Sequence, residues 1–193
     1  MIYIIRHGKT DFNKANILQG RSDYPLNEEG IKQAKETAEM LKGVKFDHVF
    51  SSPLIRAIQT AELIAPDNMI KVDRRLIEMD YGRYEGTDLN NMPVELKIFF
   101  SDFINNPTPE GMEPLQDVVK RTGEFLEETK TIEGNILIST HAIAMKGILE
   151  YLTPLSKGSY WAKYIGNCAV YIAEKTDQHI SIPTELKTKG ATK

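Results

Sequence analysis

Two histidines are the residues of this sequence best suited to nucleophilic or acid–base chemistry. His7 follows Arg6 at the end of the apolar, β-branched run 2–5, and Gly8 comes directly after it. His141 ends a later run of the same kind. A neutral imidazole has a ring nitrogen with a free lone pair near neutral pH, and Gly8 allows backbone to approach a ligand closely. An Arg-His-Gly triplet is common by chance, so its meaning depends on what the other strand ends carry.

Charged side chains follow two further apolar runs. A Ser-Ser-Pro sequence leads into a predicted helix with Arg56 in its opening turn, and Glu78 follows a short run farther along. In open α/β sheets the carboxyl ends of the strands border the ligand crevice. Guanidinium groups match phosphate oxygens, and a carboxylic acid can protonate a leaving alkoxide. Together with His7 and a protonated His141, these groups form a coherent set for phosphoryl transfer.

Strand-like and helix-like runs alternate along the chain, which predicts a layered α/β fold with a mostly parallel sheet. Buried strands are predicted at 1–5, 46–50, 69–72 and 135–140, helices at about 28–41, 54–64, 115–131 and 142–152, and a closing strand pair at 168–173 and 179–182. Helical spacing at 115–131 places Val118 and Phe125 on one inward face.

The 193-residue chain is long enough to bury a core as one domain. We expect that domain to span 1–182, with a polar tail at 183–193. Periodicity is poor between 87 and 114, so this stretch is the predicted lid or insertion. The phenylalanines within it are expected to be core residues rather than a substrate platform.

Composition restricts the partners and the compartment. A net charge of −3 disfavours nucleic acid as the main partner, and no stretch approaches the roughly 20 apolar residues of a membrane span. The one cysteine, Cys168, cannot form an intrachain disulfide, and its strand-like neighbours predict an inert core thiol. The expectation is therefore a cytoplasmic monomer or small homo-oligomer.

Five motifs occur in order along the chain. They are Arg6-His7-Gly8 with Thr10 and Asn13; Gln19-Gly20 with Asp23, Pro25-Leu26 and Gly30; Ser51 to Ala61; Leu76, Glu78, Gly82 and Tyr84-Glu85-Gly86; and Ser139-Thr140-His141. Together they resemble the histidine phosphatase superfamily, in the branch that includes cofactor-dependent phosphoglycerate mutases and small-molecule phosphatases. The likeness extends from Met1 to about Cys168. The resemblance implies a phosphoglycerate mutase-like three-layer α/β/α sandwich.

The resemblance also implies roles for individual residues. His7 would become phosphorylated and Glu78 would donate a proton, with no metal and no cofactor required. The groups that would hold the phosphoryl oxygens are Arg6, Arg56, Asn13 and His141. Asn13 could instead cap a turn, and Gln19 and Gly20 are evenly divided between substrate contact and loop structure. Glu85 is the competing acid and is expected to be structural.

Two positions depart from the family pattern. Lys9 stands where glutamate is frequent, which should make the pocket more basic. Ala142 stands where glycine commonly follows the second histidine, and a positive φ there would cost roughly 1–2 kcal/mol, so an ordinary φ is expected.

The leading functional prediction is a metal-independent phosphatase that acts on a small phosphorylated metabolite. A phosphoglycerate mutase is the alternative, but mutases of this family shield the phosphohistidine with long insertions. Between Gly86 and Leu115 this chain is short and offers one cation, Lys97, which favours water as the final acceptor. A non-catalytic phospho-ligand binding module would be expected to lack His7 or Glu78, and both are present.

Overall fold

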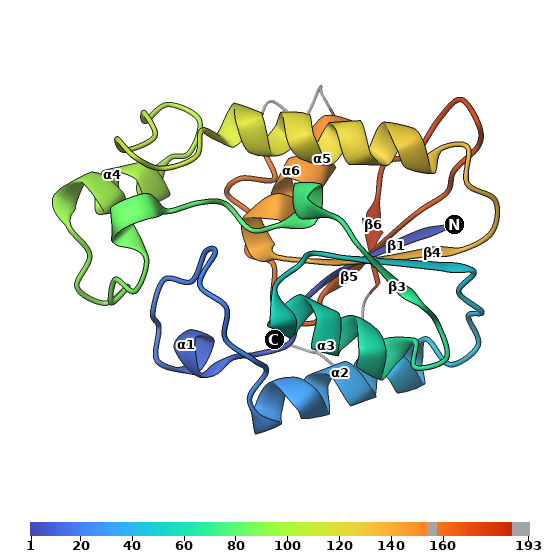
Figure 1. Cartoon of the computed structure of the whole chain (residues 1–193). Coiled ribbons are helices and arrows are strands. Elements are labelled where there is room, and N and C mark those ends of the chain that lie inside the picture. Colours follow the sequence, from blue (N-terminus) through green and yellow to red (C-terminus); the bar gives the residue numbers. More distant parts are fainter. Residues whose placement is uncertain (154–157, 187–193) are drawn as a thin grey trace.

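A six-stranded sheet in the order β3-β2-β4-β1-β5-β6 forms the centre of the molecule (Figure 1). The computed structural model describes residues 1–153 and 158–186. The strands are β1 (Ile2–Arg6), β2 (His48–Ser51), β3 (Ile70–Val72), β4 (Ile136–Thr140), β5 (Val170–Ala173) and β6 (Thr184–Glu185). Strands β3, β2, β4 and β1 are parallel neighbours, and β5 pairs antiparallel with β1. The predicted mostly parallel sheet is therefore confirmed.

Helices cover both faces of the sheet, with α2 and α3 on one side and α5 and α6 on the other (Figure 1). The helices are α1 (Asp11–Lys14), α2 (Glu28–Met40), α3 (Ile55–Ile64), α4 (Val94–Ser101), α5 (Leu115–Thr129) and α6 (Ala142–Leu152), with single 3₁₀ turns at Arg74–Leu76 and Gly82–Tyr84. Alternation along β1 explains the layers, because successive strand side chains point to opposite faces. Ile2 and Ile4 pack in the cluster of α5 and α6, whereas Tyr3 and Ile5 pack in that of α2 and α3. The three-layer α/β/α sandwich is confirmed.

The segment 87–114 packs against the rest of the molecule through a third apolar cluster. It contains α4, whose Leu96 and Phe99 are fully buried. These side chains lie in one cluster with Met79, close to the strand ends, and with Trp161 from a later loop. Phe99 is therefore a core residue, as predicted.

The C-terminal part of the sheet differs from the prediction. Residues 179–182 do not form a strand; the chain turns back at 176–179 and makes only an isolated bridge between Lys175 and Ile180. Thr184–Glu185, expected to belong to a polar tail, instead forms β6 and pairs with Tyr171 and Ile172 of β5. Pro183 lies between the two segments and has no N–H for a strand ladder, so pairing resumes only after it. Residues 187–193 lie outside the described part.

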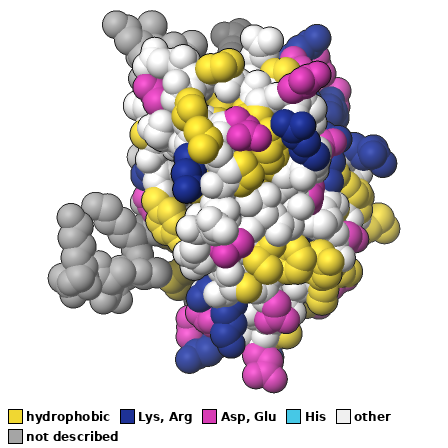
Figure 2. All heavy atoms as spheres, turned by 90° about the vertical axis from the view of Figure 1, so that its left-hand side faces the viewer, with side chains coloured by type: hydrophobic (Ala, Val, Ile, Leu, Met, Phe, Trp, Pro, Cys, Tyr) yellow, Lys and Arg dark blue, Asp and Glu magenta, His cyan; other side chains and the backbone are white. Residues whose placement is uncertain are grey.

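The parallel strands deliver their carboxyl ends to one edge, where β1, β4 and β2 stop at Arg6, Thr140 and Ser51. Figure 2 shows the molecule from the left-hand side of Figure 1, where apolar side chains lie next to lysines, arginines and acidic groups. Within the described ranges, none of the helices has the length and apolar character needed to cross a membrane.

Candidate active site

His7 lies directly after β1, and its ring is held in one tautomer. Its Nδ1 lies 2.7 Å from the carbonyl oxygen of Gly8. A carbonyl only accepts, so Nδ1 carries the proton and Nε2 keeps a lone pair. Arg56 Nε donates to that Nε2 at 3.3 Å. Burial, and then the charges of Arg56 and Arg6, hold the pKa of His7 well below its ordinary value. The imidazole is therefore neutral at neutral pH, and its nucleophilic nitrogen, Nε2, is unprotonated and hydrogen-bonded to Arg56.

Backbone contacts on both sides fix the position of His7. Its N–H donates to the carbonyl of Thr140 at the end of β4, at 2.9 Å. Its carbonyl accepts from the N–H of Cys168 at 3.3 Å and from Asn167 Nδ2 at 3.1 Å. Cys168 has a φ of +57° and a buried thiol whose pKa is raised by burial to about 12. The predicted core position of this thiol is confirmed, and the backbone of Cys168 helps to hold the histidine.

Arg56 is fully buried in the first turn of α3. Its Nη1 donates to the carbonyl of Ser22 at 2.8 Å and its Nη2 to the carbonyl of Gly20 at 2.6 Å. Burial lowers its pKa to about 10, partly offset by the charge of Glu78, so the guanidinium remains protonated at neutral pH. One arginine thus joins the loop at 20–22 to the ring of His7.

His141 is the N-cap residue of α6, and its ring centroid lies 5.1 Å from that of His7. Its Nε2 lies 2.7 Å from Ser52 Oγ. Burial, and then the charge of Arg56, hold its pKa well below the ordinary value. His141 is therefore neutral at neutral pH, and the positive charge that the sequence analysis considered for this ring requires that it gain a proton. An entering phosphoryl dianion would raise its pKa again.

Glu78 is held against the first turn of α6. Its Oε1 accepts from the backbone N–H of Met79 at 2.9 Å and of Ala144 at 3.0 Å. Both of its oxygens accept from the N–H of Ile143, at 3.1 and 3.2 Å. Free amides at a helix N-terminus favour such a carboxylate. The same helix start therefore positions the acid and His141.

Arg6 and Asn13 lie next to His7. Arg6 Nη1 donates to the carbonyl of Ile165 at 2.5 Å. Asn13 Oδ1 accepts from the N–H of Thr10 at 3.1 Å, which completes a capping box at α1. The same oxygen accepts from Asn167 Nδ2 at 3.2 Å, and that amide also donates to His7. Asn13 thus has the capping role that was its alternative, at a place beside the candidate nucleophile.

Four buried polar atoms around these residues have no hydrogen-bond partner within the described ranges. They are Arg6 Nε, Gln19 Nε2, Ser22 Oγ and His141 Nδ1. A buried polar atom without a hydrogen-bond partner destabilises the folded state, and native proteins contain few such atoms. Two belong to the strand ends, and Ser22 and Gln19 flank the loop that Arg56 binds. Arg6 Nε and Gln19 Nε2 are donors, Ser22 Oγ can donate, and His141 Nδ1 donates when the ring is protonated. Such a cluster suits an anion with several acceptor oxygens.

Glu85 organises the loop at 20–22. Its carboxylate accepts from the backbone N–H groups of Gly20 at 3.3 Å, Arg21 at 2.6 Å and Ser22 at 3.1 Å. A Cβ at Gly20 would overlap Glu85 and Tyr81, so this position requires glycine. The predicted structural role of Glu85 is confirmed. Gln19 is held by its Oε1, which accepts from Thr10 Oγ1 at 2.8 Å.

An ion pair that the sequence analysis did not predict contacts the chain on both sides of Glu78. Arg121 Nη1 donates to the carbonyls of Arg75 at 2.7 Å and Ile77 at 2.6 Å. Its Nε and Nη2 contact the two oxygens of Glu113 at 2.7 and 3.1 Å, and Glu113 accepts from the N–H of Asp80 at 3.2 Å. The only indication of this ion pair in the sequence is that a glutamate and an arginine lie 8 residues apart. We call these two residues the Arg121–Glu113 clamp.

The two departures from the family pattern have different outcomes. Lys9 does not make the pocket more basic, because its ammonium forms a surface ion pair with Glu29 on α2 at 2.7 Å. That expectation is wrong. Ala142 begins α6 with ordinary helical backbone, and among the described non-glycine residues only Asn16 and Cys168 have positive φ. That expectation is confirmed.

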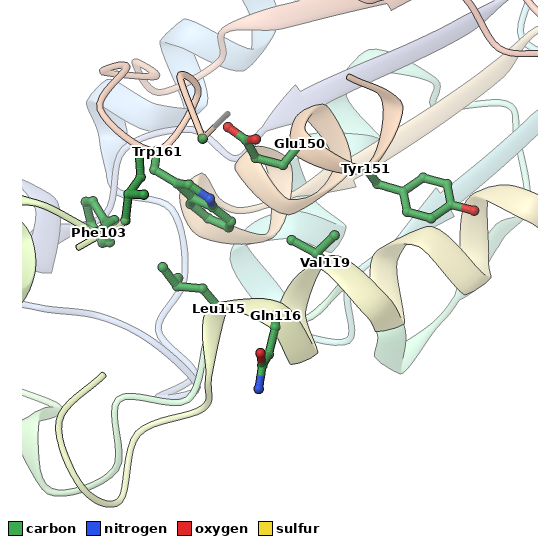
Figure 3. Close-up of a pocket in the computed structure, with 9 residues that line it drawn as sticks. Phe103, Leu115, Gln116, Val119, Glu150, Tyr151 and Trp161 are labelled. Atoms are coloured by element: carbon green, nitrogen blue, oxygen red, sulfur yellow. The ribbon is translucent and has the colours of Figure 1, made fainter. Parts of the chain in front are cut away.

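A separate apolar pocket of about 750 Å³ lies between α5, α6 and the end of segment 87–114 (Figure 3). Phe103, Leu115, Val119 and Trp161 line it, and it contains none of the predicted site residues. In the described ranges, no group of three or more histidine, cysteine or acidic side chains could hold a metal ion.

Comparison with known proteins places this geometry in a family. The sequence profile of the histidine phosphatase superfamily (branch 1) matches residues 2–184. Fructose-2,6-bisphosphatase TIGAR from Xenopus tropicalis is 44% identical over 131 residues, which cover 64% of this chain and 47% of that protein. The match thus spans about half the length of that relative. A putative phosphoserine phosphatase 2 from Hydrogenobacter thermophilus is 31% identical over 175 residues, or 88% of this chain and 86% of the relative.

A solved structure gives the same result for the fold. A variant of phosphoserine phosphatase from Entamoeba histolytica, in complex with phosphoserine, superposes with a TM-score of 0.84 at 26% identity. The superposition covers 99% of this chain and 98% of that one. The profile match, the relatives and the shared fold agree with the five motifs read from the sequence. The chain therefore belongs to branch 1 of the histidine phosphatase superfamily.

Proposed function

We propose that this chain hydrolyses the phosphomonoester of a small metabolite through a phosphohistidine on His7. The observation that carries the proposal is the state of the His7 ring, which is neutral, buried and protonated on Nδ1. Its unprotonated Nε2 accepts a hydrogen bond from Arg56 Nε at 3.3 Å. The unpartnered donors of Arg6 and Gln19, together with His141 Nδ1 once that ring is protonated, supply sites for phosphoryl oxygens. The named phosphatase relatives support the same reaction class.

The reaction follows in two steps. The His7 Nε2 lone pair attacks phosphorus, the bond from phosphorus to the ester oxygen breaks, and that oxygen takes a proton from Glu78. A water molecule then attacks the phosphohistidine and gives its proton to the Glu78 carboxylate. The phosphorus–nitrogen bond breaks, inorganic phosphate leaves and His7 is restored. Arg6, Arg56 and a His141 that gains a proton as phosphate enters stabilise the negative charge.

A phosphoglycerate mutase would return the phosphoryl group to a substrate instead of to water. The segment 87–114 offers a single cation, Lys97, for gripping such an acceptor. The proposal therefore favours net hydrolysis. A non-catalytic binding module has no use for an unprotonated, buried nucleophile or for a buried acid, and His7 and Glu78 are both present here.

The proposal extends to the surroundings of the site. Segment 87–114 would act as the lid, because it packs beside Met79, next to Glu78, through this third apolar cluster. We place the protein in the cytoplasm, as a monomer or small homo-oligomer without nucleic-acid or membrane partners. The presence of a single, buried cysteine, Cys168, and the net charge of −3 support that placement.

Trapping the intermediate tests this function. Brief incubation with phosphoserine labelled in its phosphate should leave an acid-labile, base-stable label on the protein. The label should be lost in His7→Ala and kept in His179→Ala, which changes an exposed histidine. Label that survives in His7→Ala would overturn the assignment. Phosphate release and isomerisation of 3-phosphoglycerate are measured in parallel, and faster isomerisation would make the protein a mutase.

A further inference from the structure

A second pocket, of about 530 Å³, lies between the middle of the predicted lid and the loop that follows α6. Its walls come from three parts of the chain: residues 100–104, residues 161–164 and a single residue of α6, Lys146. The aromatic rings of Phe103 and Trp161 form its apolar part. None of the residues assigned to phosphoryl chemistry line it, so this pocket has no role in the reaction as described so far.

Lys146 is an unusual wall residue, because lysines are rarely buried without a partner. It is only 8% exposed. Its Nζ donates to the carbonyl of Trp161 at 2.7 Å and lies 5.2 Å from the centroid of the Phe103 ring. An ammonium has three donors, and within the described ranges one is used. No described carboxylate forms an ion pair with it, so its positive charge is not neutralised.

The other charged groups of the pocket are already engaged. Lys163 pairs with Glu185 at 3.0 Å and lies over the ring of Tyr171. The carboxylate of Asp102 accepts three bonds from its own turn, two from Asn105 and one from the N–H of Ile104. These pairings leave Lys146 as the wall residue, within the described ranges, whose charge lacks an opposite partner.

The pocket adjoins the candidate active site through Tyr164 and Arg6. Tyr164 lines the pocket, and Arg6 Nη1 donates to the carbonyl of the next residue, Ile165, at 2.5 Å. Lys146 lies five residues after His141 on α6, the helix whose first turn holds Glu78. Burial lowers the pKa of Lys146 to about 8, while the charge of Glu78 raises it and that of Arg6 lowers it. Lys146 is therefore still mostly protonated at neutral pH, and it interacts electrostatically with Glu78 and Arg6 of the candidate active site.

We propose that this pocket receives the leaving group of the substrate and that Lys146 binds a second anionic group there, a carboxylate or a second phosphate. The inference rests on the proposed phosphatase function and adds the substrate class to it. A charge-assisted hydrogen bond to an anion would complete the donors of Lys146 and neutralise a buried cation. The rings of Phe103 and Trp161 would then contact the short carbon skeleton between the two anionic groups.

Two phosphomonoesters that differ in one group provide the test. 3-Phosphoglycerate has a carboxylate where glycerol 3-phosphate has a hydroxymethyl group. We expect the wild type to prefer 3-phosphoglycerate by about 10- to 100-fold in kcat/KM, the contribution of one hydrogen bond to a charged group. Lys146→Met keeps the apolar stem and should remove most of this preference, mainly through KM. Lys146→Arg should retain it.

A matched control separates this effect from general loss of charge. Lys71 also lies over a phenyl ring, that of Phe50 at 5.7 Å, but it is on the edge strand β3. Lys71→Met should keep the wild-type preference. To test for a second phosphate, the same preference in kcat/KM is measured between a sugar bisphosphate and the corresponding monophosphate. A preference in either substrate pair that Lys146→Met removes supports the inference, and the pair affected identifies the anionic group.

Two outcomes would overturn the inference while leaving the phosphatase function intact. One is a wild-type enzyme that hydrolyses the members of both pairs equally well, a result that needs no variant and so does not depend on whether Lys146→Met folds. The other is a preference that survives in Lys146→Met. Failure of the proposed function has a different signature, namely no phosphate release from any substrate and no label on His7.

Discussion

At the scale of single residues, burial decides the charge state of the two histidines. His7 and His141 are 4% and 0% exposed and lie near the guanidinium of Arg56. Desolvation is the larger cause of their lowered pKa values, and the arginine charges act in the same direction. The site therefore holds two neutral imidazoles in a positive field. His7 is in the state needed for attack, and His141 can gain a proton when phosphate enters.

The lowered pKa values predict a pH dependence of stability. Below about pH 6.5 the unfolded chain binds protons on these histidines, whereas the folded protein does not. The unfolded state then holds more protons, so the free energy of unfolding must fall as pH falls. Each histidine should contribute a slope of the order of 1 kcal/mol per pH unit between pH 6.5 and 5. Denaturant titrations at several pH values measure it.

Variants assign that slope to the buried rings. His7→Gln and His141→Gln should each flatten the dependence between pH 7 and 5, whatever they do to absolute stability. His179→Gln changes an exposed histidine and should keep the wild-type slope. If stability stayed constant from pH 7 to 5 in the wild type, the neutral state of both rings would be contradicted.

At the scale of elements, the reacting groups are held by strand ends and by one helix start. β1 and β4 end in register, with Arg6 opposite Thr140, so His7 and His141 follow neighbouring strands. The first turn of α6 binds Glu78 through the N–H groups of Ile143 and Ala144. The Arg121–Glu113 clamp then fixes the chain on both sides of Glu78. Arg121, on α5, binds the carbonyl of Ile77, and Glu113, just before α5, accepts from the N–H of Asp80.

The clamp predicts that Arg121→Met acts on catalysis through Glu78. It removes two bonds to loop carbonyls and leaves Glu113, whose side chain is 12% exposed, with a weaker partner in Arg21. We expect a loss of about 2–4 kcal/mol in the free energy of unfolding. Hydrolysis of an alkyl phosphate should slow by about 10- to 100-fold, because a displaced acid protonates poorly. A nitrophenyl phosphate should be affected less in single-turnover bursts, because its leaving group needs no proton.

Two comparisons make that result specific. Glu78→Gln should reproduce the difference between the two leaving groups, since it removes the proposed acid directly. Arg83→Met changes an exposed arginine in the same stretch of chain and should leave both rates unchanged. Equal slowing of both leaving groups in Arg121→Met would mean that the clamp only supports the fold.

At the scale of the whole molecule, positive charge converges on one edge of an acidic protein. The chain has a net charge of −3, yet two arginines, Arg6 and Arg56, meet at the strand ends with Lys146 nearby. Such a pocket attracts a small anion while the surface as a whole disfavours polyanions. The cations stand where a metal would otherwise supply charge.

This arrangement predicts activity that does not depend on metal. Phosphate release from an alkyl phosphate should persist after dialysis against excess chelator, because Arg6, Arg56 and His141 supply the positive charge. A zinc-dependent phosphatase treated in parallel should lose its activity and serves as the control. Loss of activity on chelation, with recovery upon addition of one metal ion, would contradict the mechanism proposed for His7.

The sequence by itself determined the order of the elements, the mostly parallel sheet and the family. These properties depend on local patterns: apolar runs that end at Arg6, Ser51 and Thr140, and helices that begin beyond them. The motif that carries each reacting group is also local. For the same reason the sequence overestimated the strand at 179–182, since an alternating run cannot show which partner it will pair with.

Only the tertiary structure decided how these groups behave. The neutrality of His141 depends on burial and on Arg56, which is 85 positions away in the chain. Glu78 acquires its position from the amides of α6, and the Arg121–Glu113 clamp acts on carbonyls more than 40 residues earlier. The outward pairing of Lys9 with Glu29 depends equally on where α2 packs. Desolvation and long-range contacts are properties of packing, so no local pattern of residues could have revealed them.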